Sequence, residues 1–255
     1  MKNIAIVGKG PSVLKGYTEL YDQFDTIVAV NWPVYTDEFK KYLPSRIDIM
    51  SATGIISPKV LKKYPMHRNY TQEQAENLKI KYILWLMSCR SSKRRNLKPN
   101  PDFVKTFNQY VDKSLMCDLT KKLYPSIPYL PIQYNMDYHK SNRKHYNLKD
   151  FDSSTGIRTL EYFSLQDGIQ NIFFIGFDAY TKGGYYYYYP YDHLNYRDDC
   201  HDREKTIEYM QNLGKIFPDK NYHYISEIDF EDYENFNQVT DTKNFTLTKL
   251  KIGRY

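Results

Sequence analysis

The sequence predicts an α/β fold, built as a Rossmann-like, mostly parallel sheet flanked by helices. Two short runs of small and β-branched residues, 4–7 and 26–30, are typical of strands buried on both faces. A glycine-containing break and a segment of helical spacing separate them, which indicates a βαβ unit. Another buried strand is expected at 171–176, after a helical segment and a glycine in the second half of the chain.

The other elements complete one α/β domain. Further strands are expected at 46–50, 82–87 and 222–225, and helices at 14–21, 103–123, 157–167 and 201–213. Residues 124–146 contain three prolines and many tyrosines, which favours loops with short strands. There is no repeat and no clear linker. We therefore expect a single nucleotide-sugar-binding α/β domain over 1–255, with residues 180–200 as a long loop within it.

Composition excludes several classes of protein. Of the 255 residues, 41% are hydrophobic and 26% are charged, which argues against a disordered chain or a coiled coil. No apolar run approaches the ~20 residues of a membrane span. The first residues lack the layout of a signal peptide, so we expect a cytoplasmic protein. The three cysteines, at positions 89, 117 and 200, form no CxxC pair and predict reduced thiols without a structural zinc site.

The net charge and the tyrosines bear on binding partners. A net charge of +6 is too small to indicate nucleic acid, although a basic patch could attract phosphate or an anionic surface. The chain has 27 tyrosines, and many of them must lie on a surface or in a groove. The basic residues at 249–254 leave a peripheral membrane contact open.

Two polar groups follow the first two predicted strands. Gly8, Gly10 and Ser12 form a Gly-x-Gly-Pro-Ser turn, where glycines let a phosphate approach the backbone at the start of a helix. A tight turn with a purely structural role explains these residues nearly as well, because the full dinucleotide fingerprint is absent. Asn31 ends the second strand, where an NAD site usually has an acidic residue, so another nucleotide is favoured.

The second half of the chain holds further candidates. Ser154, Thr155 and Gly156 begin a helix, where they act either as an ordinary N-cap or as an anion site. Asp178 and Tyr180 follow a buried strand, on the ligand-binding edge of the sheet, and Tyr186 lies in the tyrosine-rich loop. His201 suits general-base chemistry near neutral pH, but from this residue alone a satisfied or exposed histidine without a catalytic role is the better explanation.

Read in order, these motifs resemble the Campylobacter-type sialyltransferases of glycosyltransferase family 42. That family shares a strand followed by Gly-x-Gly-Pro-Ser (Gly8 to Ser12), a strand ending in Asn (Asn31) and a Ser/Thr-Gly turn before a helix. It also shares a strand ending Gly-x-Asp-x-Tyr (176–180), a second tyrosine six residues on, and a later histidine, here Tyr186 and His201. The match covers about 1–35 and 150–213. Lys9 departs from it, since the family has Asn there.

The resemblance implies a sialyltransferase-type fold with a tyrosine-rich lid at 180–200, and an inverting transfer of sialic acid from CMP-sialic acid to a sugar hydroxyl. His201 would be the base, while Tyr180 and Tyr186 would bind the departing phosphate in place of a metal. The implied donor-binding residues are Gly8, Lys9, Gly10, Ser12, Asn31, Ser154, Thr155, Gly156 and Asp178. No metal cofactor is expected. The partners are a CMP-sugar donor and a glycan acceptor, and a homo-oligomer is left open because members often form tetramers.

Two other readings compete with this one. A pyrophosphokinase-like nucleotide enzyme can use the same strand–turn–helix, and would require Mg²⁺ with ATP or GTP. A non-catalytic module that binds glycans or nucleotides would use the tyrosine loop as a carbohydrate platform and would show no turnover.

Overall fold

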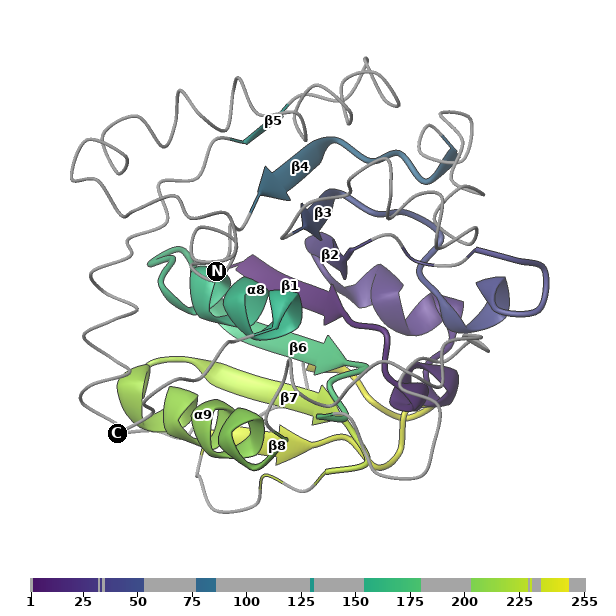
Figure 1. Ribbon diagram of the computed structural model, residues 1–255. Helices are drawn as coiled ribbons and strands as arrows, with labels where there is room; N and C mark the ends of the chain where they lie inside the picture. Colours follow the sequence, from purple (N-terminus) through teal and green to yellow (C-terminus); the bar gives the residue numbers. More distant parts are fainter. Residues whose placement is uncertain are drawn as a thin grey trace.

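The computed structural model describes residues 2–31, 33, 35–52, 77–85, 129–130, 154–179, 203–228, 230 and 235–247. These residues build one eight-stranded sheet in the order β5-β4-β3-β2-β1-β6-β7-β8, in which every neighbouring pair is parallel (Figure 1). The strands are β1 (Lys2–Val7), β2 (Thr26–Val30), β3 (Ile49–Ala52), β4 (Tyr82–Trp85), β5 (Tyr129–Leu130), β6 (Ile169–Ile175), β7 (Asn221–Ile225) and β8 (Phe236–Gln238). The expected parallel α/β fold is confirmed.

Strand β1 is the centre of the topology. Strands β2 to β5 add outward on one side of it, whereas β6 to β8 add on the other. Ile4 accordingly pairs with Thr26 of β2 and with Ile172 of β6. The strand order therefore reverses at β1, and in open α/β sheets ligands bind at the carboxyl edge beside such a reversal.

Within the described residues, two α-helices cover one face of the sheet: α8 (Thr155–Ser164) and α9 (Arg203–Ile216), both seen in front of the strands in Figure 1. On α8, the apolar residues Ile157, Leu160 and Phe163 recur at helical spacing and are buried. They join Ile4, Ile6, Val28, Val30, Ile172, Phe174, Tyr209, Met210 and Leu213 in one core. This packing sets the position of the first turn of α8 relative to the sheet.

On the other face, the described part of the chain supplies three short 3₁₀-helices, η1 (Pro11–Lys15), η2 (Thr18–Gln23) and η3 (Lys40–Tyr42), together with residues 239–247. The sequence predicted one helix over 14–21, and this prediction is wrong in type. Pro11 starts η1 and Gly16 ends it after five residues, with the Gly16 N–H bonding to the carbonyl of Val13. The helix has only five residues before the C-cap Gly16, and such short helical segments are commonly 3₁₀-helices.

A ladder of three asparagines fixes the register at the amino edge of the sheet. Asn3, Asn171 and Asn221 face one another across β1, β6 and β7. The Asn171 Nδ2 donates to Asn3 Oδ1 at 2.8 Å, and the Asn221 Nδ2 donates to Asn171 Oδ1 at 3.2 Å. A shift of one residue would break both bonds and move each buried side chain to the opposite face of the sheet.

Most predicted strands and helices of the described ranges are confirmed, with boundaries moved by a few residues. The strand expected at 46–50 lies at Ile49–Ala52, and the helices expected at 157–167 and 201–213 run over Thr155–Ser164 and Arg203–Ile216. Strand β8 was missed, because its three residues are mostly polar and only Phe236, stacked on Tyr222, is buried. The helix expected at 103–123 and the loop at 180–200 lie outside the described residues. Within the described ranges, no helix has the length and apolarity of a membrane span.

His223 is an unusual group in the core. It lies in the middle of β7, 1% exposed, beside Phe245. Neither of its ring nitrogens has a hydrogen-bond partner in the described part of the chain. Desolvation lowers the pKa of His223 from 6.5 to about 4, because a charged imidazolium is poorly solvated there.

Because the pKa of His223 is lowered in the folded protein, we expect the fold to lose stability in acid. Between pH 6.5 and pH 4 the unfolded chain takes up a proton that the folded chain excludes, so stability falls as the pH drops through this window. The loss amounts to about 3 kcal/mol at roughly 1.4 kcal/mol per pKa unit. In His223→Leu, urea unfolding at pH 7 and at pH 4.5 should give a smaller difference in stability than in the wild type. An unchanged difference would contradict the assignment.

Candidate functional site

The predicted site residues of the described ranges gather at the carboxyl edge of the sheet. Gly8 follows β1, Asn31 follows β2 and Gly176 follows β6, and these strands are adjacent and parallel. The amino end of α8 reaches the same edge, where Gly156 packs against the ring of Phe177. Segments separated by more than 100 residues in the sequence therefore form one surface.

The turns after β1 and β6 pass each other at van der Waals distance. A Cβ on Gly8 would lie 2.5 Å from the carbonyl oxygen of Gly176. Gly176 itself has a φ of +80°, and a Cβ there would meet Val13 at 2.6 Å. The close approach of these two turns therefore requires glycine at both positions, independently of any ligand.

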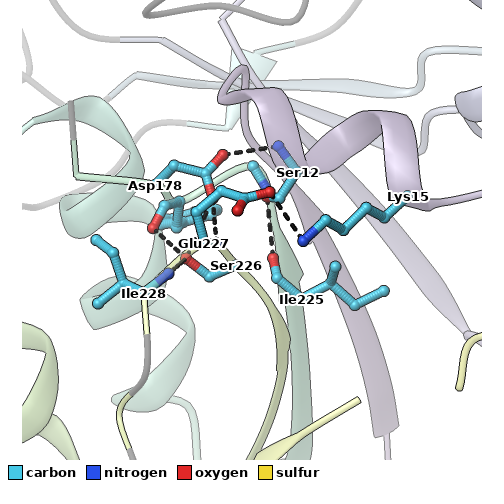
Figure 2. A network of polar contacts seen from close by, with 9 residues as sticks. Ser12, Lys15, Asp178, Ile225, Ser226, Glu227 and Ile228 are labelled. Atoms are coloured by element: carbon cyan, nitrogen blue, oxygen red, sulfur yellow. Dashed lines mark hydrogen bonds and ion pairs between the residues drawn. The ribbon is translucent and has the colours of Figure 1, made fainter. Parts of the chain in front are cut away.

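Asp178 hydrogen-bonds to the segments that follow β1 and β7, and itself follows β6 (Figure 2). Its Oδ2 accepts the backbone N–H of Ser12 at 2.8 Å, and its Oδ1 accepts the N–H of Glu227 at 2.9 Å and the hydroxyl of Ser226 at 3.1 Å. Asp178 follows β6, Ser12 follows β1, and Ser226 and Glu227 follow β7. The carboxylate is 3% exposed, so this connection is part of the protein interior.

Ser12 completes the connection with its side chain. The Ser12 hydroxyl donates to the carbonyl of Ile225 at 3.1 Å and accepts the N–H of Gly176 at 2.9 Å. Its side chain is fully buried. Both Ser12 and Asp178 were predicted to bind the donor. The structure places them beneath the surface of the edge, where they support the turns, and a direct contact of either with a donor stays a prediction.

In the turn after β1, which the sequence suggested as an anion site, the backbone N–H donors are hydrogen-bonded to acceptors within the protein. The N–H groups of Gly8 and Gly10 donate to the carbonyls of Ile175 and Gly176, at 2.7 and 2.9 Å. The Asp178 carboxylate accepts the N–H of Ser12, which is the donor that η1 would otherwise offer to a phosphate. The backbone N–H groups of Gly8, Gly10 and Ser12 therefore all have acceptors within the protein, which agrees with a structural role for this turn.

The start of α8 has polar groups that remain accessible. Ser154 is the N-cap, and its Oγ accepts the N–H of Ile157 at 3.3 Å. This bond uses the oxygen of Ser154 as acceptor, so its hydroxyl hydrogen is still available as a donor. Gly156 lies in the first turn, where intrahelical bonding leaves the backbone N–H unused. Ser154, Thr155 and Gly156 are all partly exposed.

Asn31 lies at the same edge with a left-handed backbone, at a φ of 56°. Asparagine tolerates this conformation better than most residues, which gives a local reason for its presence at the end of β2. The Asn31 N–H donates to the carbonyl of Ser51, at the end of β3, at 2.6 Å. Asn31 is partly exposed.

Lys9 is buried in the turn between Gly8 and Gly10, with an exposure of 8%. Desolvation lowers the pKa of its amino group from 10.5 to about 7. Its charge therefore changes near neutral pH, unlike that of an ordinary surface lysine. A bound phosphate would favour the protonated form.

The three residues predicted to be catalytic, Tyr180, Tyr186 and His201, lie outside the described residues. The chain approaches the first of them through Ala179, which is buried and has a left-handed φ of 43°. In the described ranges, no three His, Cys, Asp or Glu side chains cluster as metal ligands would.

Sequence analysis missed three polar residues at this edge: Ser51, Thr159 and Ser226. Ser51 is the penultimate residue of β3, and Ser226 directly follows β7, as Asn31 follows β2. The same signal, a polar residue where a buried strand ends, would have found Ser226. Ser51 was missed because the third strand was predicted to end at residue 50, two residues before its observed end. Thr159 lies inside a helix and gives no such signal.

The connection through Asp178 predicts a large loss of stability on its removal. Asp178→Ala leaves the buried N–H of Ser12 and the partly buried N–H of Glu227 without their acceptor, which should cost about 3 kcal/mol of unfolding free energy. Glu227→Gln is the matched control, because it removes only the exposed ion pair with Lys15 and should cost less than about 1 kcal/mol. Urea denaturation measures both. Equal losses in the two variants would refute the structural role.

No family model matches this sequence, and no curated protein matches it either. Solved structures do resemble it. The sialyltransferase CstII from Campylobacter jejuni in complex with cytidine-5'-monophosphate aligns over 96% of this chain and 88% of its own, with 18% identity and a TM-score of 0.55. An α-2,3-sialyltransferase from Campylobacter jejuni in apo form aligns over 96% and 83%, with 18% identity and a TM-score of 0.54.

A third structure is sialyltransferase CST-II with a trisaccharide acceptor and CMP, which aligns over 96% of this chain and 88% of its own. The identity is 16% and the TM-score 0.53. The resemblance that the motifs suggested is thus confirmed for the fold. The chain folds like the Campylobacter sialyltransferases.

Proposed function

We propose that this protein is a glycosyltransferase, and specifically a sialyltransferase that transfers sialic acid from CMP-sialic acid to a sugar hydroxyl. Two lines of support are independent of each other. The motifs quoted above follow the order found in family 42, and the fold resembles that of sialyltransferases solved with CMP. The acceptor is a glycan in this proposal, as in the structure with a trisaccharide.

One observation carries the proposal: the two available polar groups, Asn31 and the start of α8, meet at one edge. They are joined through β3, because the Asn31 N–H bonds to Ser51 and the Ser51 hydroxyl contacts Thr159 of α8 at 2.7 Å. A nucleotide monophosphate can place its phosphate at the amino end of α8, where the helix dipole favours an anion. Its nucleoside then extends toward Asn31.

The chemistry follows from the residues that the family resemblance assigns. His201 removes the proton from the acceptor hydroxyl as that oxygen attacks the anomeric carbon of the donor. Tyr180 and Tyr186 donate hydrogen bonds to the phosphate of CMP as the glycosidic bond breaks, so that no metal ion is needed. The attack comes from the face opposite the leaving group, which inverts the anomeric configuration.

The location and assembly of the enzyme are part of the same proposal. We place it in the cytoplasm, with the basic segment 249–254 available for an anionic membrane surface. A homo-oligomer is consistent with the assembly common in this family.

Nucleotide binding provides the first test. At about 100 times its dissociation constant, a ligand stabilises the folded state by roughly 2.7 kcal/mol, which raises the Tm of a chain this long by about 5–10 °C. CMP should produce this shift with and without EDTA. A shift with Mg-ATP alone would favour the pyrophosphokinase-like enzyme and reject the sialyltransferase.

Turnover of CMP-sialic acid separates an enzyme from a binding module. His201→Ala should lower kcat by about 10²- to 10⁴-fold while leaving the Kd for CMP nearly unchanged, because the base acts only on the acceptor. Tyr180→Phe and Tyr186→Phe should lower kcat as well. Full activity of His201→Ala would remove it as the base, and CMP binding without any turnover in the wild type would indicate a module.

Lys9 predicts a pH dependence of donor binding. Its amino group is charged below its pKa of about 7 and neutral above it, whereas the donor phosphodiester keeps one negative charge throughout. The affinity for CMP-sialic acid should therefore fall, by roughly tenfold, as the pH rises from 6 to 9. Lys9→Gln should bind more weakly at pH 6 and show a flat profile. A sloping profile in Lys9→Gln would assign the titration to another group.

A further inference from the structure

We propose that Ser51 and Thr159 form a positioning pair for the donor nucleotide, a role that rests on the proposed function and assigns residues not otherwise linked to it. The pair holds the first turn of α8 against the ends of β2 and β3. Neither residue is expected to touch the donor, because both side chains are fully buried. They act through Asn31 and through the start of the helix.

The two hydroxyls meet at 2.7 Å across the space between sheet and helix. Ser51 lies at the carboxyl end of β3, and Thr159 lies one turn into α8. The residues around them, such as Val30 and Ile157, belong to the apolar core. A polar pair in such surroundings is held firmly, because either hydroxyl alone would be costly to bury.

The contact between the two hydroxyls is part of a longer chain of hydrogen bonds. Each hydroxyl has one hydrogen to donate, but the pair makes three contacts. The Thr159 hydroxyl donates to the carbonyl of Thr155 at 2.7 Å, so the Ser51 hydroxyl donates to Thr159. The longer contact of Ser51 with the carbonyl of Ala29, at 3.3 Å, is then the alternative use of the same hydrogen.

The chain ends at both parts of the proposed nucleotide site. On the sheet side, the carbonyl of Ser51 accepts the N–H of Asn31 at 2.6 Å. On the helix side, the bond from Thr159 reaches Thr155, which lies between Ser154 and Gly156. The order Asn31–Ser51–Thr159–Thr155 therefore connects the group proposed for the nucleoside with the groups proposed for the phosphate.

The hydrogen bond between Ser51 and Thr159 is directional, whereas an apolar contact of equal size is not. Two methyl groups could fill the same space, but they would allow α8 to rotate or slide slightly on the sheet. Hydrogen bonds constrain both distance and angle. Since a displacement of about 1 Å at a binding group can cost up to a hundredfold in function, a fixed helix start matters for the phosphate.

The test uses Thr159→Val, which keeps the shape of the side chain and removes its hydroxyl. Ser51 can then donate to the carbonyl of Ala29, so no buried hydrogen is left without an acceptor. We expect the Kd for CMP, measured by calorimetry, to rise by about tenfold. Thr159→Ser restores the hydroxyl and should return the Kd to within about twofold of the wild type.

Ser164→Ala is the matched control, because Ser164 is a buried hydroxyl at the opposite end of the same helix. It donates to the carbonyl of Leu160 at 2.8 Å and accepts the hydroxyl of Tyr222 at 2.9 Å. We expect a fall in Tm similar to that of Thr159→Val, with the Kd for CMP changed by less than about twofold. A loss of stability alone therefore does not reproduce the expected result.

Ser51→Ala removes the same bond from the sheet side, and the double variant Ser51→Ala/Thr159→Val should bind CMP no more weakly than either single variant. If the wild type binds CMP but Thr159→Val and Ser51→Ala bind as tightly as Ser164→Ala, the positioning role is wrong and the proposed function stands. Failure of the wild type to bind CMP overturns the proposed function and this role with it.

Discussion

The carboxylate of Asp178 provides the constraint on which the ligand-binding edge depends. It accepts hydrogen bonds from the segments that follow β1 and β7, and it belongs to the segment that follows β6. Because Asp178 accepts the N–H of Ser12, this donor at the start of η1 is used within the protein. In the described part of the chain, the start of α8 reaches the same edge and is partly exposed. The start of η1 thus serves the fold, and the start of α8 is the one that we propose for binding.

The sequence was sufficient to predict the parallel sheet, because residues 4–7, 27–30 and 172–175 form short, uninterrupted apolar runs of the kind found in strands buried on both faces. It was not sufficient for the layer behind the sheet. Residues 14–21 have helical spacing, yet Gly16 divides them into two 3₁₀-helices, and spacing alone does not show where a glycine will end a turn. Strand β8 could not be predicted, because its own residues have no strand pattern and it is a strand through its pairing with β7.

The candidate site shows the same division between local and non-local information. Asn31 and Ser154 could be identified because each sits where an element ends or begins, and that is visible in the sequence. The role of Gly8 was harder to judge, since its reason lies in the carbonyl of Gly176, far along the chain. Ser51 and Thr159 are joined across 108 residues, and no local pattern shows that these two hydroxyls meet.

The central place of β1 has a consequence for biosynthesis. One side of β1 pairs with residues 26–29, but the other side pairs with residues 169–175. At about 5–20 residues per second, the ribosome needs roughly 10–30 s to produce that second partner. During this interval the nascent chain carries an apolar strand with one open edge, which is a template for association between chains. Expression at low temperature or with chaperones should therefore favour soluble protein.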